Sequence, residues 1–213
     1  ITRKQRRRNP TAPFTTSTLQ QEASRKLGFN TQRTMRTAQK LYEGIDIPGE
    51  GTVGLITYMR TDSPSIAQVA IDEIRDVIVE RYGKDNLPKE QRDYRTKSKN
   101  AQEAHEAIRP TSSARTPDAL RASLDDDQFR LYDLIWKRSV ASQMVPAVFD
   151  TVAADLAPGE APGDQTGVGM FRANGSILVH PGFMAVYQEG RDDKNSDDKD
   201  RRLPDMKEGD VIE

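Results

Sequence analysis

The segment Gly54–Ser63 carries the clearest chemistry in this sequence, because it places a tyrosine, Tyr58, at the end of an apolar run and follows it with Arg60 and Asp62. A phenol with its usual pKa of about 10 is a poor nucleophile at neutral pH. A neighbouring guanidinium stabilises phenolate character and the negative charge of an attacked phosphate, and its planar fork can hold two phosphate oxygens. Attack on a phosphodiester would store the bond as a phosphotyrosyl ester, so resealing would need no ATP.

The same segment has an ordinary structural interpretation. A tyrosine that ends a strand is usually a packed residue with one hydrogen bond. The residues alone therefore leave two interpretations of Tyr58 open, a nucleophile and a packed side chain.

A second polar group lies at 97–110. On a helix, Gln102, His105 and Arg109 would fall along one face, which could contact phosphate. The alternative is a solvated helix of alternating charge. His180, ahead of Pro181, is interpreted as structural.

Composition excludes several other kinds of site. The chain has no cysteine and two histidines, so disulfides and thiolate metal sites are absent and a histidine-based metal site is nearly excluded. No Walker loop, GxGxxG or HExxH motif is present. No apolar run approaches the roughly 18 residues of a membrane span. The net charge of −1 hides local asymmetry, because residues 1–10 hold five cations that could face phosphate or simply be solvated. A start at Ile1 inside this basic run indicates a fragment.

The first part of the chain has helical periodicity. A capping box at Ser17 and Gln20 predicts a helix that stops at Gly28. Asn30 or Thr31 caps a second predicted helix that ends at Gly44, and the pair resembles a helix-turn-helix arrangement.

The middle of the chain mixes a loop, a short strand and further helices. We expect a loop at 44–54, a short buried strand or extended stretch at 53–59, and an amphipathic helix from Ser63-Pro64 to Gly83. A short helix is predicted at 101–108, and a buried helix from Phe129 to Met144.

After residue 146 the periodicity changes to short β-type runs. These lie at 148–156, 168–172, 176–179 and 184–187, and Asn174-Gly175 predicts a hairpin turn. The sequence therefore predicts an α+β fold that is mainly helical, with a helical domain before residue 146 and β structure after it.

Four segments, taken in order, resemble the type IA DNA topoisomerases. They are Pro13–Gln20, Ala38–Glu43, Gly54–Ser63 and Ala101–Thr111. Met59 resembles the bacterial topoisomerase I branch of that family.

The resemblance implies a role for each matched position. Tyr58 would be the nucleophile that forms a 5′-phosphotyrosyl link, and Arg60 would contact the DNA phosphate at the break. The other implied site and DNA-binding positions are Thr57, Thr61, Asp62, Gln39, Glu43, His105 and Arg109.

The resemblance also implies an architecture. Residues 1–12 would connect from a β arch domain, 13–146 would form the helical tyrosine-bearing domain, and 147–213 would form a β-rich part of the arch. The enzyme would cleave and reseal one strand and so relax negative supercoils without ATP. Its Mg²⁺ would bind in a separate acidic domain outside this chain, with no metal site within it, so the fragment alone would be inactive.

The implied partners are single-stranded segments of negatively supercoiled DNA and the remaining domains of the same enzyme, with no membrane. The implied location is the cytoplasm, at the nucleoid. Two other functions stay open: a non-catalytic DNA-binding helical module that uses Tyr58 for packing, and a protein-interaction domain whose basic stretches hold another protein.

Overall fold

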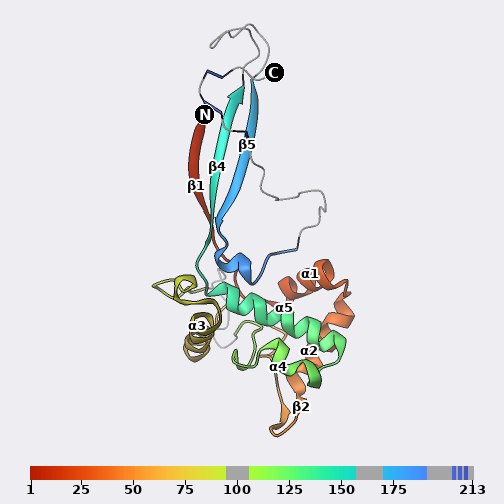
Figure 1. Ribbon diagram of the computed structural model, residues 1–213. Helices are drawn as coiled ribbons and strands as arrows, with labels where there is room; N and C mark the ends of the chain where they lie inside the picture. Colours follow the sequence, from red (N-terminus) through yellow and green to blue (C-terminus); the bar gives the residue numbers. More distant parts are fainter. Residues whose placement is uncertain (95–105, 157–169, 191–202, 205, 208, 211–213) are drawn as a thin grey trace. The chain divides into compact units, whose positions relative to one another are not determined.

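The computed structural model describes residues 1–94, 106–156, 170–190, 203–204, 206–207 and 209–210. The chain divides into two compact units (Figure 1). The sheet unit comprises Ile1–Asn9, Pro146–Gly182 and Asp193–Glu213, and the helical unit comprises Pro10–Val145 and Phe183–Asp192.

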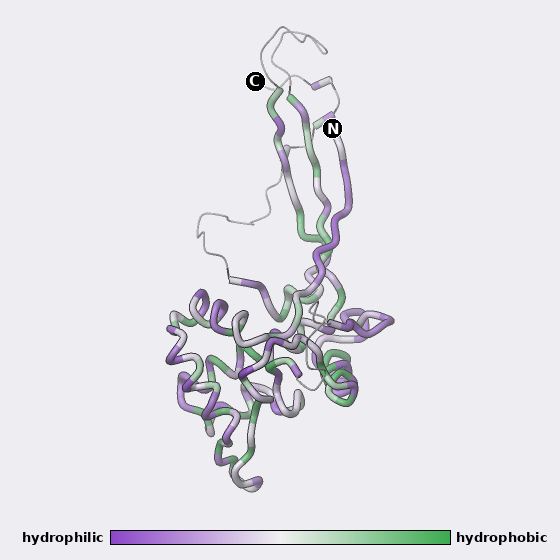
Figure 2. The backbone as a smooth tube through the Cα atoms, turned by 180° about the vertical axis from the view of Figure 1, so that it is seen from behind, coloured by the Kyte–Doolittle hydropathy of each residue, from purple (hydrophilic) through white to green (hydrophobic). Residues whose placement is uncertain are grey.

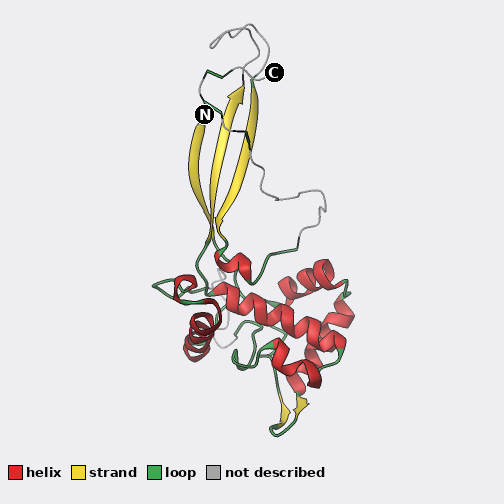
Figure 3. Ribbon diagram, viewed as in Figure 1, coloured by secondary structure: helices red, strands yellow, loops and turns green. Residues whose placement is uncertain are grey.

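The helical unit is built around its longest helix, α5 (Asp126–Ser142). The other four helices in the described part of the unit all contact α5, which places it at their centre (Figure 3). Its core is apolar, with Leu41, Ile74 and Leu131 fully or almost fully buried. Burial of such side chains is the main favourable term in folding. The helices are α1 (Thr16–Leu27), α2 (Thr31–Glu43), α3 (Gln68–Tyr82), α4 (Pro117–Leu120) and α5 (Asp126–Ser142), with single 3-10 turns η1 (Lys84–Asn86) and η2 (Arg121–Ser123).

The first two helices confirm most of the predicted boundaries. Gly28 ends α1 in the left-handed conformation (φ 68°), Asn30 caps α2, and Gly44 follows the end of α2. The predicted capping box at Ser17 and Gln20 is wrong. Thr15 is the N-cap and Thr18 completes the box, because several hydroxyl residues in a row offer alternative caps and tertiary contacts select one of them.

Two predictions for the middle of the chain are also wrong, the loop at 44–54 and the start of the following helix at Ser63. The expected loop at 44–54 contains a hairpin of β2 (Ile45–Ile47) and β3 (Gly51–Val53). The short buried strand or extended stretch expected at 53–59 is confirmed in part, because it lies beyond the end of β3 at Val53 but pairs through an isolated antiparallel bridge between Ile56 and Pro110.

Helix α3 begins at Gln68 rather than at Ser63. Ser63 Oγ instead accepts a hydrogen bond from Ser65 N at 3.2 Å, which holds a local turn. The N-cap position is Ala67, and its backbone N–H donates to Glu106 Oε1 at 2.7 Å. A distant carboxylate thus takes over a role that the local sequence assigned to Ser63.

The predicted helix at 101–108 lies partly outside the described residues. Its described end is not helical, because Ala107 has no regular structure and Ile108 forms a bridge with Phe14. The predicted helix ending at Met144 is confirmed as α5, which closes at Ser142.

The sheet unit is a three-stranded antiparallel sheet in the order β1 (Thr2–Arg8), β4 (Ala147–Leu156) and β5 (Phe171–His180). Strand β1 contains the five cations near the N-terminus and is hydrophilic along its length (Figure 2). The Asn174-Gly175 hairpin prediction is wrong, because both residues lie inside β5, opposite Ala153 and Val152. The run predicted at 184–187 begins in a 3-10 turn, η3 (Gly182–Ala185).

A buried ionic network ties residues 183–190 to the rest of the helical unit. Tyr187 Oη donates to Glu22 Oε2 at 2.6 Å, and the backbone N–H of Gly190 donates to the same oxygen at 2.9 Å. Arg138 donates to Glu189 Oε1 at 3.0 Å and to the carbonyl of Ala12 at 2.6 Å. These bonds satisfy two nearly fully buried charges, Glu22 and Arg138.

Candidate active site

Three segments far apart in the sequence meet around Tyr58. Phe14 and Ile108 form one antiparallel bridge, and Ile56 and Pro110 form another. Thr57 N donates to the carbonyl of Arg109 at 2.9 Å. The three stretches 13–20, 54–63 and 106–111, picked out on the sequence, are therefore neighbours in the fold.

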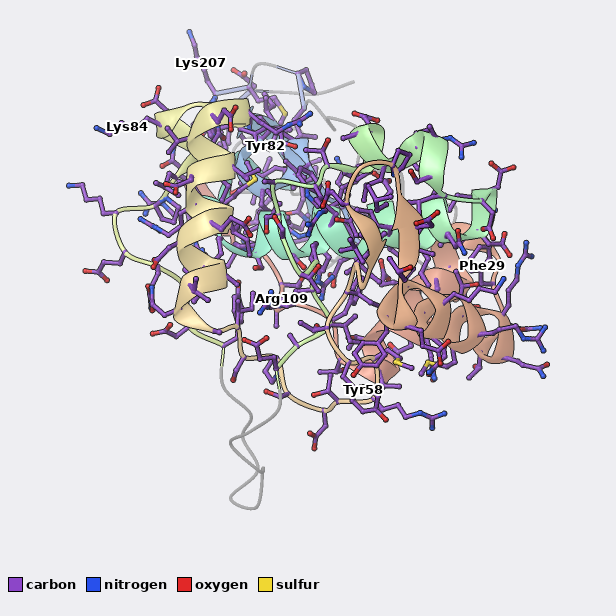
Figure 4. The ribbon with its side chains drawn as sticks, turned by 90° about the horizontal axis from the view of Figure 1, so that it is seen from below. Phe29, Tyr58, Tyr82, Lys84, Arg109 and Lys207 are labelled. Atoms are coloured by element: carbon purple, nitrogen blue, oxygen red, sulfur yellow. The ribbon has the colours of Figure 1, made fainter. Side chains whose placement is uncertain are left out.

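Tyr58 stands at the surface of this junction. Its side chain is 45% exposed, whereas Ile56 and Met59 are each only 1% exposed. Figure 4 shows the Tyr58 ring at the outer edge of the helical unit. Burial of the flanking apolar residues anchors the backbone, so the phenol faces solvent from a fixed support.

Thr16 clamps the backbone just after Tyr58. Its Oγ1 donates to the carbonyl of Met59 at 2.7 Å and accepts from Thr61 N at 2.9 Å. Thr16 N donates to the carbonyl of Thr61 at 2.9 Å. The start of α1 therefore holds both sides of Arg60 in place.

Arg60 and Asp62 are both exposed. Within the described part of the chain, neither side chain has a hydrogen bond or an ion pair. Arg60 follows Tyr58 by two residues, and no carboxylate among the described residues pairs with its guanidinium. It remains available for an anionic ligand.

The side-chain hydroxyls of Thr57 and Thr61 form hydrogen bonds with backbone groups. Thr57 Oγ1 donates to the carbonyl of Ala107 at 2.6 Å and accepts from Arg109 N at 3.0 Å. Thr61 Oγ1 accepts from Ser63 N at 3.1 Å. Their hydroxyls shape the segment that carries Tyr58.

Arg109 is committed to contacts inside the unit. Nε and Nη2 donate to Glu106 Oε2 at 3.2 and 2.6 Å, and Nη1 donates to the carbonyl of Pro110 at 2.9 Å. Its side chain is only 11% exposed. The structure therefore gives Arg109 a structural position next to Thr57, and His105 lies outside the described residues.

Gln39 and Glu43 lie one turn apart near the end of α2, and the Gln39 amide donates to the Glu43 carboxylate. Between them in sequence is Tyr42, whose ring contacts the Tyr58 ring edge-on, with centroids 5.3 Å apart.

Sequence reasoning did not single out Thr16, Tyr42 or Glu106. Thr16 and Glu106 act through partners more than 35 residues away, which no local pattern reveals. Tyr42 had one available signal, an aromatic side chain at the end of a helix close to the Tyr58 segment.

No group of three or more His, Cys, Asp or Glu residues that could hold a metal ion occurs among the described residues. In the same residues, no helix has both the length and the apolar character needed to cross a membrane.

The helical unit presents the exposed Tyr58 two residues before Arg60, whose side chain has no hydrogen bond or ion pair with any described residue. The sequence pattern of the family described as DNA topoisomerase matches residues 1–213. The chain therefore belongs to the DNA topoisomerase family, and the predicted membership is confirmed.

Individual relatives agree with this assignment. The chain is 56% identical over 214 residues to proteins named DNA topoisomerase 1 from two strains of Xylella fastidiosa, Temecula1 and 9a5c. It is similar in structure to full-length topoisomerase I from Thermotoga maritima, with a TM-score of 0.79 and 34% identity over 98% of this chain and 31% of that one. The match covers all of this chain but 25% of each Xylella protein, so the chain spans a quarter of their length.

Proposed function

We propose that this chain carries the nucleophile of a type IA DNA topoisomerase and that Tyr58 attacks a phosphodiester of one DNA strand. The observation that carries the proposal is the exposed Tyr58 ring on a backbone clamped by Thr16, with the exposed Arg60 two residues further on and no described residue paired with it. Membership of the topoisomerase family supports the same reaction.

The reaction balances without an external energy source. The Tyr58 phenol oxygen forms a bond to phosphorus as the bond from phosphorus to the 3′ oxygen breaks, and the phenol proton ends on that 3′ oxygen. The 5′ side of the break is then held as a phosphotyrosyl ester. Resealing is the reverse of these steps, so one strand can be opened and closed without ATP.

Arg60 would bind the non-bridging oxygens of the attacked phosphate. Charge builds on these oxygens in the transition state, and a positioned guanidinium stabilises it. Asp62, Gln39 and Glu43 would border the bound strand, and Thr57 and Thr61 would keep the Tyr58 backbone in register. We place His105 and Arg109 beside the cleaved bond, with Arg109 acting through its contacts to Glu106 and Thr57.

We further propose that the remaining domains of a longer enzyme complete the site. Mg²⁺ would be held there, as the resemblance to type IA topoisomerases implies. The helical tyrosine domain would span 13–146, with 1–12 and 147–213 belonging to a β arch. The isolated chain would bind single-stranded DNA but not relax negative supercoils, and the enzyme would work in the bacterial cytoplasm at the nucleoid.

Tyr58→Phe in the full-length enzyme tests the proposal. The variant should lose the covalent DNA adduct that appears when the reaction is stopped with denaturant, while its affinity for single-stranded DNA and its unfolding temperature stay near those of the wild type. Tyr82→Phe, on α3, is the matched control and should retain the adduct. An adduct that persists in Tyr58→Phe would make this chain a non-catalytic DNA-binding module.

A further inference from the structure

A second exposed aromatic ring lies next to Tyr58. Tyr42, in the last turn of α2, is 41% exposed, and its ring meets the Tyr58 ring at 62° with centroids 5.3 Å apart. In the described part of the chain its hydroxyl has no hydrogen bond. The exposed part of Tyr42 is therefore an aromatic ring whose hydroxyl is not held by any described residue.

The backbone holds the two rings in a fixed relation. Leu55 N donates to the carbonyl of Leu41 at 2.7 Å, which joins the Tyr58 segment to the end of α2. A Cβ added to Gly54 would lie 2.7 Å from the carbonyl oxygen of Tyr42. The two segments approach so closely that only glycine fits at position 54. The backbones that carry Tyr42 and Tyr58 are therefore held close together.

The cations of α2 do not share the face of Tyr42. Lys40 and Arg36 lie two and six residues before it, spacings that put them on other sides of the helix. An exposed aromatic ring near an exposed cation, here Arg60 two residues beyond Tyr58, is the combination that binds single-stranded nucleic acids, since bases stack on rings and phosphates pair with cations.

We propose that Tyr42 is a stacking platform for one base of the cleaved strand, at a nucleotide close to the phosphate that Tyr58 attacks. The proposal rests on the proposed function. Stacking on Tyr42 would hold the strand so that this phosphate lies against the Tyr58 oxygen. Arg60 would pair with a phosphate of the same strand. Tyr42 is therefore a strand-binding residue that can accept any base, because every base has a π-face.

The test uses the full-length enzyme carrying Tyr58→Phe, so that binding is measured without cleavage. Single-stranded oligonucleotides carry the fluorescent purine 2-aminopurine at one nucleotide at a time on either side of a known cleavage site. We expect strong quenching on binding at one of these nucleotides, because an aromatic neighbour stacks on the base. Adding Tyr42→Leu should abolish the quenching at that nucleotide, whereas Tyr42→Phe should retain it.

An abasic site at the same nucleotide provides a second measurement that does not depend on a variant. It should weaken binding by at least about fivefold in the Tyr58→Phe enzyme, and Tyr42→Leu should add little further loss. Quenching that survives in Tyr42→Leu, or an abasic site that leaves affinity unchanged at every nucleotide tested, would overturn the proposal. Both readouts are independent of adduct formation, so a failure of Tyr58 as nucleophile is distinguishable from a failure of Tyr42 as platform.

Discussion

Thr16 Oγ1 donates a hydrogen bond of 2.7 Å to the carbonyl of Met59, the residue between Tyr58 and Arg60. The same oxygen accepts from Thr61 N at 2.9 Å. One hydroxyl in the first turn of α1 thus satisfies backbone groups on both sides of Arg60. The position of the candidate nucleophile depends on a helix that begins more than 40 residues earlier in the chain.

Thr16→Val should misplace the Tyr58 segment. Valine keeps the shape of threonine but leaves Thr61 N without this acceptor, which should cost about 1–3 kcal/mol of the free energy of unfolding. Urea unfolding measures that loss, and the yield of covalent DNA adduct in the full-length enzyme should fall with it.

Thr18→Val is the matched control for Thr16→Val. Thr18 belongs to the capping box of α1, so its loss should cost about 1 kcal/mol without touching Met59 or Thr61. An adduct yield that falls equally in both variants would mean that only the stability of α1 matters.

Gly54→Ala should also displace the backbone of the Tyr58 segment, here where it approaches the end of α2. Its new Cβ would meet the Tyr42 carbonyl oxygen at 2.7 Å, so the backbone must move. We expect a loss of about 1–3 kcal/mol in unfolding free energy and a lower adduct yield.

Gly28→Ala separates general strain from local displacement. Gly28 has a φ of 68° and no atom within 4 Å of an added Cβ, so alanine there costs stability through the left-handed backbone alone. Adduct yield at equal folded fraction should stay near wild type in Gly28→Ala and drop in Gly54→Ala.

Glu106→Ala should destabilise residues 106–111, which pair with the Tyr58 segment. Glu106 accepts from Arg109 at 2.6 Å and from the backbone of Ala67 at 2.7 Å. Its removal leaves both donors unpaired at a cost of about 1–3 kcal/mol, measured by urea unfolding. Glu80→Ala, at an exposed position of α3, should change the unfolding free energy by less than about 0.5 kcal/mol.

Stability should fall in alkaline solution because of two buried tyrosines. Burial raises the pKa of Tyr132 well above its usual value near 10, and burial and then the hydrogen bond to Glu22 do the same for Tyr187. Below pH 10 both phenols are neutral in the folded and unfolded chain. Above it, the unfolded chain loses these protons first, so the unfolding free energy decreases as pH rises.

Urea unfolding at about pH 8 and about pH 10.5 checks this. Tyr132→Phe should lose about 1 kcal/mol at the lower pH, because the 2.6 Å hydrogen bond to the carbonyl of Arg115 is gone. It should then lose less than the wild type between the two pH values. An equal pH dependence in both proteins would contradict the assignment to Tyr132.

Local signals were sufficient wherever a structural feature depends on neighbouring residues. Gly28 ends α1 and Asn30 caps α2, as predicted. Helix α5 lies where its apolar periodicity placed it. Local signals failed where partners from elsewhere compete. Asn174-Gly175 has a strong turn preference, yet pairing with β4 holds it extended inside β5.

The sequence by itself determined the family and the segment that holds Tyr58, because the order of residue types within a short window carries that information. Only the tertiary structure decided that Thr16 clamps this segment, that Glu106 accepts from the backbone of Ala67, and that the Tyr42 ring lies against Tyr58. The physical reason is that most of these contacts join residues far apart in the chain, and their geometry exists only after the helices and bridges have packed together.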